Sequence, residues 1–75
     1  MDGSAVRQRL LDVLIDRVRE ETYPSVTMMN RIEAGLRTRE QLEDYATVLI
    51  QKVESTRFPS LAMLDRVDAV AARLE

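Results

Sequence analysis

The sequence of 75 residues contains no cysteine and no histidine. This absence excludes disulfide bridges, thiolate zinc sites and imidazole metal sites, and it leaves a catalytic triad without its base or its nucleophile. The only glycines are Gly3 and Gly35, so the glycine-rich loops of dinucleotide-binding and P-loop proteins cannot be built. We therefore expect no enzymatic activity, no cofactor and no metal ion.

Long apolar runs are also missing, since no stretch approaches the roughly 18 residues that a membrane-spanning helix needs. The first residues, Met1 to Ser4, lack the charged and apolar regions of a signal peptide. These observations predict a cytoplasmic protein without a membrane partner. The net charge of −2 argues against a surface that is tuned as a whole to nucleic acid.

The small size of the chain limits its core. A chain of this length buries only about 60% of the surface that its unfolded form exposes. Small proteins usually compensate with disulfides, metals or association, and the first two are excluded here. We therefore expect association, with a homodimer as the leading possibility.

An internal repeat of about 35 residues is the most informative positive feature. Residues 13–34 align with residues 48–69, and nine of the 22 aligned pairs are identical. The tripeptide Tyr23-Pro24-Ser25 returns as Phe58-Pro59-Ser60. We expect one domain over residues 1–75, made of a first copy at about residues 4–37 and a second copy at about residues 38–75.

The apolar spacing predicts two helices in each copy. In the first copy, a long helix has Ser4 as its N-cap and ends before Pro24. A short helix then runs from Ser25 to about Ala34, and Gly35 provides a left-handed C-cap.

The second copy repeats this pattern, with Thr38 opening a capping box for its long helix and Ser60 starting its short helix. The expected fold class is therefore all-α, a four-helix unit made of two pseudo-symmetric helical hairpins. Tyr23 and Phe58 take the same place in the repeat, so we expect each of them to pack against one end of the bundle.

The long helices have wider apolar faces than one neighbour requires. At about 100° per residue, the apolar side chains from Leu10 to Val18 span an arc of about 140°, and Val13 lies about 60° outside it. Val13 and Val48 are identical in the two copies, which favours a second contact surface there. The candidate interface residues are Leu11, Val13, Ile15, Val48 and Ile50.

The leading functional hypothesis is a small non-enzymatic module for protein–protein interaction and dimerisation, acting as an accessory or regulatory factor. One alternative is a helix-turn-helix-like DNA-binding regulator that uses three arginines around the turn, Arg31, Arg37 and Arg39. Nucleic acid is the weaker hypothesis, because Arg31 stands where the motif needs a small residue and nearby carboxylates would repel phosphates.

A further alternative is a carrier of a hydrophobic ligand. Methionine side chains adapt to irregular surfaces, and the short helices contain Met28, Met29 and Met63. A cavity between the methionine-containing helices would hold such a ligand, but core filling is the commoner explanation for these residues.

Overall fold

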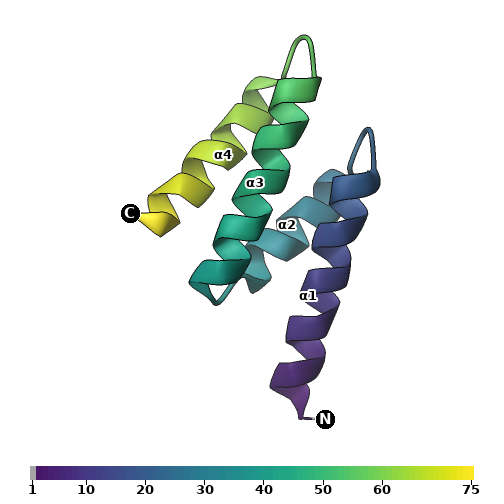
Figure 1. Ribbon diagram of the computed structural model, residues 1–75, viewed down its shortest axis with the longest axis vertical. Coiled ribbons are helices and arrows are strands. Elements are labelled where there is room, and N and C mark those ends of the chain that lie inside the picture. The colour runs from purple at the N-terminus through teal and green to yellow at the C-terminus, as the bar shows by residue number, and fades with distance from the viewer. Residues whose placement is uncertain (1) are drawn as a thin grey trace. The chain divides into compact units, whose positions relative to one another are not determined.

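A computed structural model describes residues 2–75, and Figure 1 shows its course. This part of the chain forms four α-helices and no strand, which confirms the all-α class. The helices are α1 (Gly3–Glu20), α2 (Val26–Gly35), α3 (Arg39–Ser55) and α4 (Leu61–Leu74). Among the described residues, no helix combines the length and the apolar character that crossing a membrane requires.

The chain divides into two compact units, which meet in sequence between Arg37 and Thr38. In unit 1, α1 packs against α2, and in unit 2, α3 packs against α4. Each unit is thus a helical hairpin in which a long helix is followed by a shorter one (Figure 1).

Three predicted helix starts are confirmed by side-chain caps. The Ser25 hydroxyl accepts a hydrogen bond from the Met28 backbone N–H at 3.3 Å. The Ser60 hydroxyl accepts one from the Met63 N–H at 3.1 Å, and Thr38 caps α3 in the same way. Each cap satisfies one of the backbone donors that a helix start leaves without an intrahelical partner.

Two predicted caps are wrong. The N-cap of α1 is Asp2, whose carboxylate accepts from the Ala5 N–H at 2.8 Å, so the helix begins before Ser4. Aspartate caps as well as serine does, and its charge also suits the positive end of the helix dipole. Gly35 is the last residue of α2 rather than a left-handed C-cap, since no described glycine has a positive φ.

The reason for a glycine at position 35 lies in packing. A Cβ atom at Gly35 would lie 3.2 Å from Cδ1 of Leu11 in α1, which is tighter than ordinary contact. Leu36 follows as the extended C-cap of α2 and is buried. The missing side chain therefore lets the end of α2 approach α1 closely at the level of Leu11.

The aromatic residues before the two prolines do not pack as expected. Tyr23 is 90% exposed and Phe58 is 83% exposed. The Phe58 ring has the Arg57 guanidinium 5.5 Å from its centroid, a cation–π arrangement at the surface. The repeated Pro-Ser pair thus ends one helix and starts the next, and neither aromatic side chain belongs to the core.

Buried apolar side chains come from every helix. In unit 1 they are Leu11, Ile15, Val18, Met29, Ile32 and Leu36. In unit 2 they are Leu42, Tyr45, Val48, Leu49 and Val70. The long helix α1 thus supplies three of the six in unit 1, and α3 supplies four of the five in unit 2.

The two threonines of α3 provide a prediction about the caps. The Thr38 hydroxyl accepts from the Gln41 N–H at 3.1 Å, whereas the Thr47 hydroxyl donates to the Glu43 carbonyl, which lies within the same helix. We expect Thr38→Ala to lower the free energy of unfolding by about 1 kcal/mol. Thr47→Ala should change it by less than about 0.5 kcal/mol, because alanine is the better helix former and the lost bond is redundant. Urea denaturation followed by circular dichroism measures both, and equal losses would contradict the assigned cap.

Candidate functional site

The five candidate interface residues fall into two groups. Leu11, Ile15 and Val48 are buried, whereas Val13 and Ile50 are 46% and 47% exposed. Position 13 aligns with 48 and position 15 with 50, so each aligned pair contains one buried and one exposed residue. The apolar pattern is repeated in sequence, but its burial is not repeated at these positions.

This exchange of burial involves a whole face of each long helix. In α1 the buried residues are Leu11, Ile15 and Val18. Their aligned residues in α3 are Ala46, Ile50 and Val53, and none of these is classed as buried. When the two sequence copies are aligned, the positions that α3 buries lie roughly 100° around the helix axis from the positions that α1 buries, at about 100° per residue.

The face that α3 buries remains open on α1. Val6, Leu10 and Val13 follow one another at helical spacing and are 50%, 47% and 46% exposed. We call these three residues the α1 stripe. Their aligned residues in unit 2 are Gln41, Tyr45 and Val48, all of which are buried.

Helix length explains part of the difference in burial between the two hairpins. At 1.5 Å per residue, the 18 residues of α1 span about 27 Å, whereas the 10 residues of α2 span about 15 Å. Because the end of α2 at Gly35 lies against Leu11, the first turns of α1, including Val6, extend beyond it. In unit 2, by contrast, α4 extends back to the first residue of α3, where the Arg39 guanidinium donates to the Leu74 carbonyl at 3.1 Å.

A groove lies beside the α1 stripe, where α2 ends. Its volume is about 230 Å³, and its apolar lining consists of Leu10, Leu11 and Leu14. The other lining residues are Ser4, Arg7, Gln8, Arg31, Gly35 and Arg37. The groove therefore combines an apolar floor with three arginines and no carboxylate.

The three arginines of the groove differ in their contacts. Arg37 donates to the carbonyls of Ala34 and Leu36 and so binds the open end of α2. The side chains of Arg7 and Arg31 form no hydrogen bond or ion pair within residues 2–75. Two cationic groups thus stand beside leucine side chains without an internal counter-ion.

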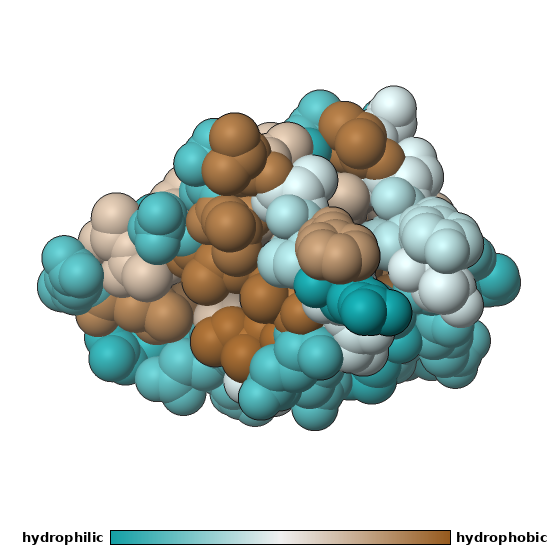
Figure 2. Space-filling view, turned by 90° about the horizontal axis from the view of Figure 1, so that it is seen from above, coloured by the Kyte–Doolittle hydropathy of each residue, from teal (hydrophilic) through white to brown (hydrophobic). Residues whose placement is uncertain are grey.

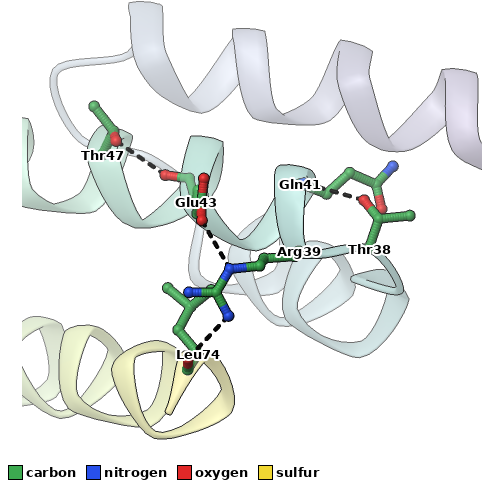
Figure 3. A network of polar contacts seen from close by, with 6 residues as sticks. All are labelled: Thr38, Arg39, Gln41, Glu43, Thr47 and Leu74. Atoms are coloured by element: carbon green, nitrogen blue, oxygen red, sulfur yellow. Dashed lines mark hydrogen bonds and ion pairs between the residues drawn. The ribbon is translucent and has the colours of Figure 1, made fainter.

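The structure separates the three arginines proposed for nucleic acid. Arg31 and Arg37 line the groove of unit 1, together with Arg7, which sequence reasoning did not select. Arg39 belongs to unit 2, where its guanidinium pairs with Glu43 at 3.0 Å and donates to the Leu74 carbonyl (Figure 3). Arg39 therefore ties the two ends of the second hairpin together.

The surface has apolar areas and no metal site among the described residues. Apolar side chains gather at the surface between charged ones in Figure 2. Within residues 2–75, no group of three or more acidic side chains is placed to hold a metal ion. The α1 stripe and the groove together place half-exposed apolar side chains beside arginines.

Comparison with known proteins adds no assignment, because no protein-family model, curated protein or solved structure matches this chain significantly.

The exchange of burial between aligned positions can be tested with four alanine variants. We expect Ile15→Ala to cost about 2–5 kcal/mol of unfolding free energy, and Val48→Ala about 2 kcal/mol, because both remove buried methyl groups. Ile50→Ala and Val13→Ala should each cost less than about 1 kcal/mol. Urea denaturation at low micromolar protein concentration measures all four. Equal losses within each aligned pair, 13 with 48 and 15 with 50, would contradict the described burial.

Proposed function

We propose that this protein is a non-enzymatic module for protein–protein association that forms a homodimer through the α1 stripe and the adjoining groove. The observation that carries the proposal is the exposure of Val6, Leu10 and Val13, whose aligned residues in unit 2 are buried. Single exposed apolar residues are ordinary on protein surfaces. Three at helical spacing beside a leucine-lined groove are the kind of contiguous patch that marks an interaction site.

The free energy available from this surface is significant for so small a protein. Complete burial of a valine or leucine side chain contributes about 1.5–3 kcal/mol. Covering the exposed half of the three stripe residues would thus contribute roughly 2–4 kcal/mol before the costs of association. The core of a chain this size supplies only about 3–5 kcal/mol by itself.

We also propose that the two hairpins are pseudo-symmetric copies of one ancestral unit that came to bury different faces of their long helices. The aligned caps support this idea, since Ser25 binds the Met28 N–H and Ser60 binds the Met63 N–H at equivalent positions. The second copy has the longer short helix. In this interpretation the first copy kept an open apolar face, which became the binding surface.

The two rival functions find less support in the groove. A DNA-binding regulator would use Arg31 and Arg37 as phosphate contacts, but the adjacent leucine floor offers phosphates no hydrogen-bond donor. A carrier of a hydrophobic ligand needs a site of about 300–1,000 Å³, whereas the groove holds about 230 Å³ and no methionine lines it. Its size suits one or two side chains of a protein partner.

A substitution in the stripe tests the proposed function. We expect the wild-type protein to be a dimer in light scattering at high micromolar concentration and Leu10→Glu to be a monomer with unchanged helix content, because a carboxylate would be buried in the interface. Val26→Glu is the matched control: Val26 is 60% exposed, belongs to unit 1 and starts α2, where an acidic residue is favoured. It should remain a dimer. A wild-type monomer, or a Leu10→Glu dimer as tight as the wild type, would refute the proposal.

A further inference from the structure

The groove of unit 1 occupies the position at which unit 2 has an additional helical turn. Ser4, which lines the groove, aligns with Arg39, whose guanidinium binds the Leu74 carbonyl in the last turn of α4. Gly35, where α2 ends, aligns with Val70, after which α4 continues to Leu74. The first hairpin thus lacks the turn of helix that covers the corresponding place in the second.

The rim of the groove specifies the charge of an occupant. Arg7 and Arg31 are exposed and have no partner among the described residues, and none of the described lining residues is acidic. A side chain that enters the groove must match the leucine floor, and its neighbours must offer carboxylates to the arginines. The fitting occupant is a helix that presents leucine and an acidic residue on the same side.

This chain has such a helix side on α4. Leu61 and Leu64 are 79% and 38% exposed, and Asp65 and Asp68 are exposed without a hydrogen bond or ion pair among the described residues. The four residues are spaced as i, i+3, i+4 and i+7, so they lie on one side of the helix. We call them the α4 edge. The buried residue of α4, Val70, lies on the opposite side.

We propose that the occupant of the groove is the α4 edge of a second copy of this chain, with Leu61 or Leu64 on the leucine floor and Asp65 and Asp68 paired with Arg7 and Arg31. In a twofold dimer each chain gives its groove and its edge, so the contact forms twice. Two contacts bring the buried area closer to the roughly 1,200–2,000 Å² of a stable interface. This inference rests on the proposed dimerisation through unit 1 and names the surface that meets it.

Charge exchange between two variants tests the pairing. The groove variant carries Arg7→Glu and Arg31→Glu, and the edge variant carries Asp65→Arg and Asp68→Arg. Each alone should dimerise at least about tenfold more weakly than the wild type, because like charges then face each other in both contacts. An equimolar mixture should form a heterodimer about as stable as the wild-type dimer, since both of its contacts join opposite charges. Native mass spectrometry separates the heterodimer by mass, and light scattering gives the dissociation constants.

The matched control is Arg9→Glu with Arg57→Glu, which changes the net charge by the same amount at two exposed arginines that do not line the groove. It should dimerise about as tightly as the wild type. Its mixture with the edge variant should form no heterodimer as stable as the wild-type dimer. Circular dichroism checks that each variant keeps its helix content. A wild-type dimer that is unaffected by both reversals, or weakened by them without recovery in the mixture, would overturn the groove and edge pairing while leaving dimerisation through the stripe intact. A wild-type monomer would overturn the proposed function itself.

Discussion

The short helix of a hairpin can cover only the length of the long helix that it spans and only the face that is turned toward it. In unit 1, Gly35 sets the end of α2 against Leu11, so the first two turns of α1 extend past it. In unit 2, the bond between Arg39 and the Leu74 carbonyl shows that α4 reaches the beginning of α3. One hairpin is covered along its length, and the other keeps an open apolar stripe and groove.

The small core and the exposed apolar surface of α1 are related. A chain without cysteine or histidine cannot add a disulfide or an imidazole metal site to a core of this size. In the function that we propose, the apolar surface left open on α1 is a source of binding free energy. We propose that charge then favours an acidic partner surface, since Arg7 and Arg31 have no counter-ion within residues 2–75.

Sequence reasoning predicted the helical class and the starts of α2, α3 and α4, because the serine and threonine caps are local signals. It missed the cap at Asp2 and the role of Gly35, since Gly35 serves a contact with Leu11 that only packing reveals. The interface candidates Val13 and Val48 look identical in sequence but differ in exposure. Periodicity identifies an apolar face, whereas the lengths and packing of neighbouring helices decide which part of it is buried. Arg7 was missed because it lies far from Arg31 in sequence.

We propose that association covers the open apolar surface of unit 1 in the stable form of the protein. The decisive measurement is the thermal unfolding midpoint of the wild-type chain over a hundredfold range of protein concentration. Association that favours the folded state makes the midpoint depend on concentration. We expect the midpoint to rise by roughly several degrees across that range. A midpoint that stays constant from the lowest to the highest concentration would contradict it.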